Sequence, residues 1–321
     1  MFRLWRLSIL LAPLVALLIW GALREDVEQL EPGAWTRSLA EREADPWPRS
    51  YQDLSGRVVI PSPPQRIVSG TIFSDAVLLA ICPRERIRAL IRTGRDSRYS
   101  PVAEESRGFS RHVGGDPVEI LAEEPDFITV SSFSRKAARD LLGKTSGAVV
   151  RFRSFESVSH IQDNIRALGW MIGLDREAEK LVQGMQSELE VIATGAPQRK
   201  SWRVLLYLGG RTGGVRTTFD SLLSHVGARN AAREIGLDGS APISPEQVIA
   251  LDPDVIVLGA ETGDGAAARE GFLQIPGMKS LRAVEREHLL MVPNAWLLST
   301  SHHAARAARR IADTLDRWGG S

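Results

Sequence analysis

The feature that most constrains the fold of this chain is a pattern that occurs twice. Residues 119–130 (EILAEEPDFITV) and residues 246–258 (EQVIALDPDVIVL) each have the pattern of a short helix, a Pro-Asp turn and an apolar strand. Strands that are apolar throughout, without polar alternation, are typical of parallel sheets covered by helices on both faces. Because one supersecondary unit recurs far along the chain, we expect an α/β fold with two similar, Rossmann-like lobes.

Other parts of the chain show the same alternation of apolar strands and helical stretches. The further predicted strands are residues 66–69, 148–150, 204–207 and 289–292. Between the expected lobes, residues 158–193 place apolar side chains on one helical face, namely Leu181, Val182, Met185, Leu189 and Ile192. We therefore expect lobes at 49–155 and 197–321, joined by a long backbone helix within 156–196. Whether Gly169 or Gly173 breaks that helix stays open.

The N-terminal segment has the composition of a membrane-inserted or exported sequence. Leu7–Leu23 contains no charged residue and would span about 25 Å as a helix, near the lower limit for crossing a bilayer. Arginines precede it and acidic residues follow it, which indicates a cytoplasmic N-terminus and an exported remainder. Residues 1–24 are either an uncleaved anchor or a cleaved signal, although Trp20 is bulky for a cut after Ala22. Residues 25–48, rich in acidic residues and proline, are predicted to be a linker.

Composition excludes several functional classes. Lys and Arg number 40 and Asp and Glu 39, so the chain lacks the basic excess expected of a nucleic-acid binder. Its one cysteine, Cys82, cannot form an internal disulfide or a Cys-rich metal site, and it lies too far from the N-terminal segment for lipid attachment. Of the six histidines, His302 and His303 should diverge on a helix and so not share one metal, while His160 and His225 are predicted on helices, which disfavours a bare-metal site.

No catalytic motif is complete. The stretch Gly143–Thr145 lacks the earlier glycine of a phosphate loop, because Ala138 occupies that place, and no G-x-S-x-G is present. We therefore expect a non-enzymatic protein with no catalytic residues and no cofactor.

Five short motifs in order give the chain a family resemblance over about residues 50–318. It resembles the helical-backbone substrate-binding proteins of ABC importers, which capture iron–siderophore complexes, haem and cobalamin. The motifs are residues 53–58 followed by 64–69, residues 113–115, residues 164–173 followed by 177–181, residues 218–223 and residues 227–232.

The resemblance implies a periplasmic, monomeric receptor that binds a metal chelate between its lobes and docks on an ABC permease. The family presents one acidic residue on each lobe to permease arginines. Glu246 matches the second-lobe position, whereas Val118 falls at the first-lobe position and Glu119 follows it. Two alternatives remain: a chelate sensor tethered to the membrane by residues 7–23, and, less favoured, a chelatase-like enzyme on the same fold.

Candidate ligand-binding residues follow the strands, since ligands of open α/β sheets lie beyond the carboxyl ends of the strands. In haem-binding relatives a tyrosine near Tyr99 can ligate iron. An anionic chelate could be neutralised by arginines, namely Arg98 and Arg211 and also Arg92 and Arg95. Trp296 could stack on a macrocycle. The predicted ligand-binding residues are Thr71, Phe73, Arg98, Tyr99, Arg211 and Trp296.

Overall fold

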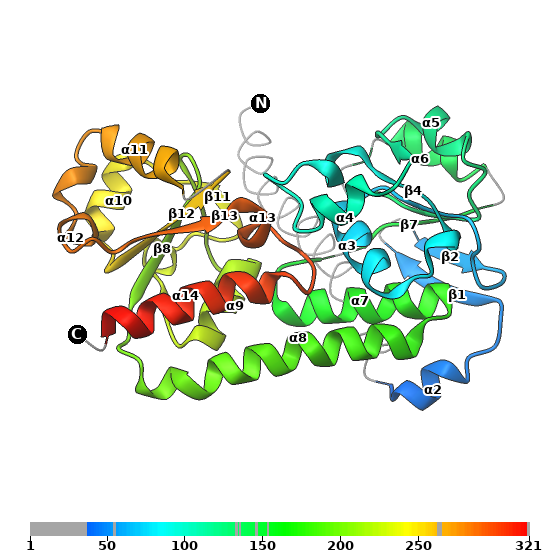
Figure 1. Cartoon of the computed structure of the whole chain (residues 1–321), viewed down its shortest axis with the longest axis horizontal. Helices are drawn as coiled ribbons and strands as arrows, with labels where there is room; N and C mark the ends of the chain where they lie inside the picture. Colours follow the sequence, from blue (N-terminus) through cyan, green and yellow to red (C-terminus); the bar gives the residue numbers. More distant parts are fainter. Residues whose placement is uncertain are drawn as a thin grey trace, which may run out of the picture.

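Two parallel sheets organise the chain in the computed structural model (Figure 1), which describes residues 37–53, 56–131, 134, 136–144, 147–152, 154–261 and 265–319. In spatial order, the first sheet contains β5 (His112–Val113), β4 (Ile87–Ile91), β3 (Ile67–Ser69), β6 (Phe127–Thr129) and β7 (Ala148–Val150). The second contains β10 (Arg229–Asn230), β8 (Arg203–Tyr207), β12 (Val255–Ala260) and β13 (Leu289–Pro293). All neighbouring strands within each sheet are parallel, which confirms the α/β prediction.

Helices and small hairpins complete each half. The first half adds α3 (Ile72–Ile81), α4 (Ala103–Arg107), α5 (Pro117–Leu121), α6 (Lys136–Leu142) and the antiparallel pair β1 (Arg49–Asp53) and β2 (Gly56–Ile60). The second adds α9 (Thr218–Val226), α10 (Pro245–Leu251), α11 (Ala266–Gln274), α12 (Arg282–Glu285), α13 (Asn294–Leu297), α14 (Ala304–Gly319) and the antiparallel pair β9 (Arg211–Gly213) and β11 (Ser240–Pro242). We call these halves the N-lobe and the C-lobe.

The repeated Pro-Asp turn has the same structural role in both lobes. In the N-lobe, the Asp126 carboxylate accepts hydrogen bonds from the backbone N–H of Gln65 and Arg66, each at 2.8 Å. In the C-lobe, Asp254 accepts from the N–H of Arg203 at 3.0 Å. Asp126 therefore joins the start of β6 to the chain that enters β3. In the same way, Asp254 joins the start of β12 to the start of β8.

Strand residues alternate between two cores. In β12, Val255 and Val257 belong to a large core that also includes side chains from both sheets, α7 (Val158–Ile172) and α8 (Asp175–Gly195). Ile256 and Leu258 face the opposite side and join a separate C-lobe core. Because side chains alternate across a strand and both faces are covered, β12 is apolar throughout.

The expected linking region is two helices rather than one. Gly173 ends α7 in the left-handed conformation, with φ 72°, which costs a glycine no Cβ clash. Gly169 stays helical, and a Cβ there would lie 2.2 Å from the Cβ of Ala178 on α8. Gly173 therefore interrupts the helical stretch, while Gly169 lets the two helices approach closely. Figure 1 shows α8 running beneath both lobes.

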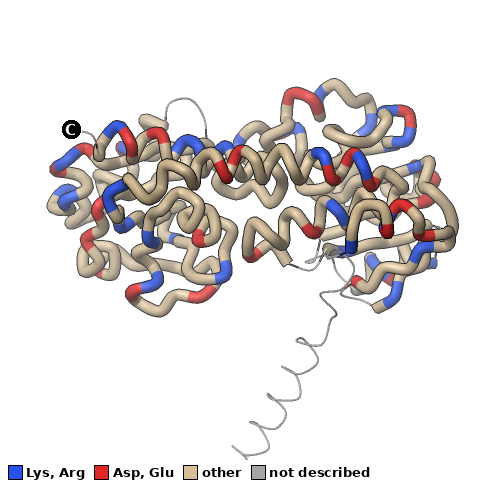
Figure 2. The backbone as a smooth tube through the Cα atoms, turned by 90° about the horizontal axis from the view of Figure 1, so that it is seen from below, with Lys and Arg blue, Asp and Glu red and all other residues tan. Residues whose placement is uncertain are grey.

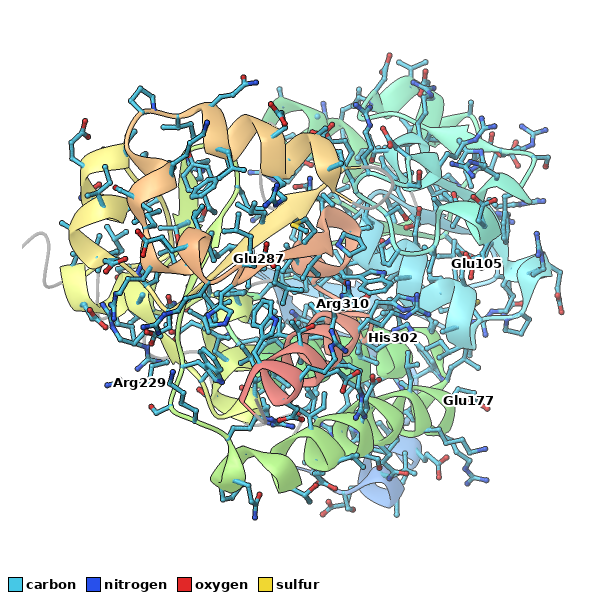
Figure 3. The ribbon with its side chains drawn as sticks, turned by 60° about the vertical axis from the view of Figure 1, so that its left-hand side comes forward. Glu105, Glu177, Arg229, Glu287, His302 and Arg310 are labelled. Carbon is cyan, nitrogen blue, oxygen red and sulfur yellow. The ribbon has the colours of Figure 1, made fainter. Side chains whose placement is uncertain are left out.

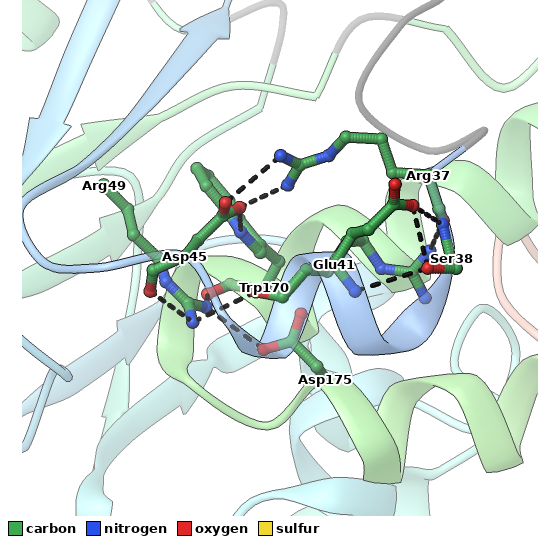
Figure 4. Close-up of polar contacts among 8 residues, drawn as sticks. Arg37, Ser38, Glu41, Asp45, Arg49, Trp170 and Asp175 are labelled. Atoms are coloured by element: carbon green, nitrogen blue, oxygen red, sulfur yellow. Dashed lines mark hydrogen bonds and ion pairs between the residues drawn. The ribbon is translucent and has the colours of Figure 1, made fainter.

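Residues 37–49, which we call the strap, pack on this helix pair instead of forming an open linker (Figure 4). The strap contains α2 (Leu39–Glu43), which begins with a capping box between Ser38 and Glu41. Arg42, only 3% exposed, donates to Glu179 at 2.7 Å, and the indole N–H of Trp170 donates to Asp45 at 2.7 Å. A hydrogen bond from α7 and an ion pair with α8 thus hold part of the segment predicted as a linker.

The predicted anchor or signal, Leu7–Leu23, lies outside the described residues. Among the residues that are described, no helix has the length and apolar character needed to span a bilayer.

Candidate ligand-binding cleft

Three cavities meet at Leu298, an exposed leucine that follows α13. The first is about 740 Å³ and belongs to the C-lobe, the second is about 340 Å³ and lies between the lobes, and the third is about 170 Å³. Leu298, 49% exposed, lines all three. The N-lobe contributes Ile72, Phe73, Thr93 and Tyr99 to the second cavity, and the C-lobe contributes Leu298, Ser299, Thr300 and Ser301. The structure therefore contains a cleft with walls from both lobes.

Phe73 and Thr71, both predicted ligand-binding residues, lie at the start of α3 and differ in role. Phe73 lines the cavity between the lobes and packs edge-to-face against Phe152 and Phe155, with ring centroids 4.8 and 5.0 Å away. Thr71 caps α3, and its hydroxyl is bonded to the backbone N–H and the hydroxyl of Ser74. Thr71 thus positions the helix start, while the Phe73 ring reaches the cavity.

The second N-lobe wall is the segment that follows β4 through the short 3₁₀ helix η2 (Arg92–Arg95). Tyr99, 41% exposed, lines the cavity, and the Arg98 guanidinium lies 5.3 Å from the centre of its ring. Arg98 also pairs with Asp96 at 2.6 Å, and this hydrogen-bonded contact raises the pKa of Arg98 and lowers that of Asp96. The two predicted residues Arg98 and Tyr99 are therefore adjacent, but Arg98 already has an acidic partner.

Beneath this segment lies a fully buried carboxyl group, Asp75. Its Oδ1 accepts from the backbone N–H of Ile91 at 3.2 Å, and a Cβ at Gly94 would clash with its Oδ2. Burial raises the pKa of Asp75 to about 8, despite hydrogen bonds that oppose the shift. Asp75 thus supports the cleft wall from below, mainly as the protonated acid at neutral pH.

In the C-lobe the structure separates Arg211 from Trp296. Arg211 lines the third cavity and donates to the carbonyl of Ser240 at 2.9 Å across the β9–β11 pair. Trp296 is half-buried, packs against the large core and lines none of the cavities described above. Of the six predicted ligand-binding residues, Phe73, Tyr99 and Arg211 reach cavities of this cleft.

The histidine pair departs from expectation. His302 (Figure 3) and His303 lie in the turn before α14 rather than on the helix. Their ring centroids are only 4.0 Å apart. The expectation that the rings diverge is therefore wrong. Burial lowers the pKa of His302 to about 4 and that of His303 to about 3, so both are neutral at pH 7. Within the described residues, no group of three or more His, Cys, Asp or Glu is placed to hold a metal.

Charge around the cleft is more balanced than the sequence suggests. Arg92 pairs with Glu119 at 2.9 Å, as Arg98 does with Asp96, so two of the predicted anion-binding arginines have acidic partners. Figure 2 shows basic and acidic positions interspersed along both lobes. The acidic Glu261 lines the largest cavity. Attraction for an anionic ligand is consequently weak at these arginines.

Glu119 and Glu246, the two glutamates expected to contact a permease, differ in their surroundings. Glu119 accepts from the N–H of Gly114 at 2.7 Å as well as from Arg92, and both contacts lower its pKa. Glu246 is exposed at the start of α10 and makes no ion pair with the described part of the chain; the Ser244 hydroxyl lowers its pKa. Val118, beside Glu119, is 67% exposed. Figure 1 shows α5 and α10 on the side of their lobes away from α7 and α8.

Sequence reasoning missed Glu261 and the face of α11 in the lining of the cavity of about 740 Å³, which also includes Tyr207, Leu258 and Asn294. The rule that selects segments after strands also applies to the segment after β12, where Glu261 lies, and would have found it. Leu298 has no such local signal, because only tertiary packing leaves this leucine exposed among cavities.

Comparisons with known proteins agree with this geometry. A family model described as periplasmic binding protein matches residues 112–295. An uncharacterized ABC transporter substrate-binding lipoprotein of Bacillus subtilis, YvrC, is 24% identical over 289 residues, covering 83% of this chain and 88% of that protein.

Two solved structures show the same fold at low identity. One, an ABC-type Fe³⁺-hydroxamate transport protein from Saccharomonospora viridis, has a TM-score of 0.67 and 16% identity, covering 84% of this chain and 99% of that one. The other, the periplasmic haem-binding protein RhuT from Roseiflexus, has a TM-score of 0.64 and 21% identity, covering 78% and 97%.

Proposed function

Because the chain belongs to the periplasmic binding protein family, we propose that it captures a metal chelate outside the cytoplasm and delivers it to an ABC importer. The observation that carries this proposal is the cavity lined by Phe73 and Tyr99 from one lobe and by Leu298–Ser301 from the other. A ligand held there contacts both lobes at once. Ligand occupancy can therefore alter the relation between the lobes that a permease would meet.

The proposed ligand is an iron–siderophore complex, haem or cobalamin. The names of the two solved structures refer to Fe³⁺-hydroxamate transport and to haem binding, which supports this class. In this proposal Phe73, Tyr99 and Arg211 contact the ligand, while Thr71, Arg98 and Trp296 position the groups around them. Leu7–Leu23 acts as the export signal or as a membrane tether.

We further propose that the permease docks on the side that carries α5 and α10. Glu246 is the stronger candidate contact, because its carboxylate is exposed and makes no ion pair with the described residues. Glu119 is the weaker one, because its carboxylate is already held by Arg92 and Gly114.

Fluorescence titration of the purified protein tests the ligand class. Ferrichrome, ferrioxamine B, its N-acetylated derivative, haem and cobalamin are added in turn, and tryptophan quenching is followed. At least one chelate is expected to bind with a Kd at or below about 1 μM. If none of the five binds in that range, the proposed function is wrong.

Tyr99 variants extend the titration. Tyr99→Ala removes a cavity wall and should weaken binding of whichever chelate binds, whereas Tyr99→Phe keeps the ring. A haem complex whose absorbance changes in Tyr99→Phe would identify the phenolate as an iron ligand, and an unchanged spectrum would limit Tyr99 to packing.

A further inference from the structure

The largest cavity lies within one lobe rather than between the two. Its volume of about 740 Å³ falls in the range of small-molecule sites and is about twice that of the cavity between the lobes. It is situated where β8 and β12 end, with α11 as a wall and Leu298 shared with the cleft. A ligand bound in the cleft can therefore extend beneath α11.

Small residues keep this cavity open. Along α11 and its start, the lining residues are Gly265, Ala267, Ala268 and Gly271. A Cβ placed at Gly271 would meet no heavy atom within 4 Å. The α11 wall also carries the apolar Phe272 and Ile275, and the ends of β8 and β12 add Leu208 and Leu258. The space is therefore suited to an apolar group of appreciable width.

Among the polar side chains that line the cavity, Tyr207, Glu261 and Asn294, Glu261 carries the charge. The Oδ1 of Asn294 has almost no accessible surface, so Glu261 is the acceptor that the cavity offers. No Lys, Arg or His lies among the lining residues that the structure describes. The charge of Glu261 acts on Arg98 of the N-lobe, which is itself paired with Asp96. A carboxylate entering this space would lose water and meet Glu261 without a cationic partner, which is unfavourable.

We propose that the cavity beneath α11 receives an apolar arm of the chelate that carries an N–H or ammonium donor, so that the protein selects neutral or cationic chelates over anionic ones. The inference rests on the proposed function and specifies the chemical class of its ligand. The donor pairs with the Glu261 carboxylate, and the apolar part of the arm fills the space beside α11.

A glycine substitution can fill the cavity without disturbing the fold. Gly271→Leu replaces an exposed helical glycine with a better helix former in open space. Gly184→Leu is the matched control, because Gly184 is an exposed glycine of α8 with equally open surroundings and lines none of the cavities described above. Both variants should retain or exceed the wild-type Tm.

The probes are ferrioxamine B, which ends in an ammonium arm, its N-acetylated neutral derivative, and haem, which carries two propionates. We expect Gly271→Leu to weaken ferrioxamine B binding at least tenfold and Gly184→Leu to leave it unchanged. Glu261→Gln should weaken binding of ferrioxamine B more than that of the acetylated form.

The outcomes separate the two proposals. If Gly271→Leu binds ferrioxamine B as tightly as wild type, or if wild type binds haem more tightly than both hydroxamates, the cavity inference is overturned while the chelate-binding function stands. If wild type binds none of these probes and neither ferrichrome nor cobalamin, the proposed function itself fails, and the inference fails with it.

Discussion

At the scale of single residues, the buried Asp75 shows how one carboxyl group couples the N-lobe to pH. It is completely buried, and hydrogen bonds from the Ser69 hydroxyl and the Ile91 N–H offset part of the loss of water around it. The folded state therefore holds a proton on Asp75 up to about pH 8, whereas the unfolded chain releases that proton near pH 4.

This difference predicts a pH dependence of stability that Asp75→Asn should remove. Between about pH 4 and pH 8 the folded state binds more protons than the unfolded chain, so the free energy of unfolding falls as pH rises. The limiting slope for one proton is about 1.4 kcal/mol per pH unit. Asparagine keeps an acceptor for the Ile91 N–H but cannot ionise.

Urea unfolding at pH 5 and pH 8 measures the effect. The loss of stability between the two values should be clearly smaller in Asp75→Asn than in wild type, because all other groups are shared. An identical loss in both proteins would show that Asp75 is already ionised in the folded state.

At the scale of elements, the strap and the α7–α8 pair are joined by a buried ion pair. Arg49, 5% exposed, donates to Asp175 at 3.1 Å and to the carbonyl of Trp170, and its guanidinium lies 4.6 Å from the centre of the Trp47 ring. Burial raises the pKa of Asp175, while Arg49 acts in the opposite direction. Removing Arg49 would leave a buried carboxylate without its main partner.

We therefore expect Arg49→Ala to lower the free energy of unfolding by about 3–5 kcal/mol. Arg176→Ala is the matched control, because Arg176 also joins α8 to α2 through Glu43, but its side chain is 63% exposed. That exposed pair should contribute about 0–1 kcal/mol. Thermal or urea unfolding compares the two variants, and equal losses would contradict the distinction between buried and exposed pairs.

At the scale of the whole molecule, α8 and the core shared by both lobes limit how far the lobes move. The apolar face of α8, which includes Val182, Met185 and Leu189, belongs to the same core as side chains from both sheets. A continuous packed core favours small lobe displacements over wide opening. Docking surfaces on the two lobes would then keep a nearly constant separation.

This geometry gives a prediction for docking. With the importer reconstituted in proteoliposomes, Glu246→Ala should weaken binding of the loaded protein about tenfold, or about 1.4 kcal/mol. Glu119→Ala should have a smaller effect, because Arg92 already pairs with that carboxylate. Glu177→Ala, an exposed position on α8 (Figure 3), is the control. Binding of Glu246→Ala at the wild-type level would exclude Glu246 as a contact.

Local patterns were sufficient to predict the architecture. Apolar strands and the recurring Pro-Asp turn predicted two α/β units, because strand period and turn chemistry depend on neighbouring residues. The apolar stripe of 158–193 predicted the helical connection in the same way. It did not reveal which glycine ends α7, since only the structure shows that Gly173 adopts the left-handed conformation while Gly169 stays helical against Ala178.

The site depended on contacts that no local pattern contains. The segments after the strands were predicted to bind ligand, and Phe73, Tyr99 and Arg211 do line cavities. Arg98 and Asp96 pair within one loop, so that contact is local in sequence. Arg92 and Glu119 come from distant segments, so no local pattern predicts their ion pair.

Sequence alone determined the fold class, the repeated units and most strands, because these follow from residue spacing along the chain. Tertiary structure alone decided that Arg92 pairs with Glu119, why Leu298 is exposed, how the strap is held and where the cavity beneath α11 lies. Each of these depends on burial and charge between segments far apart in sequence, and their distances are set only when the lobes pack on α7 and α8.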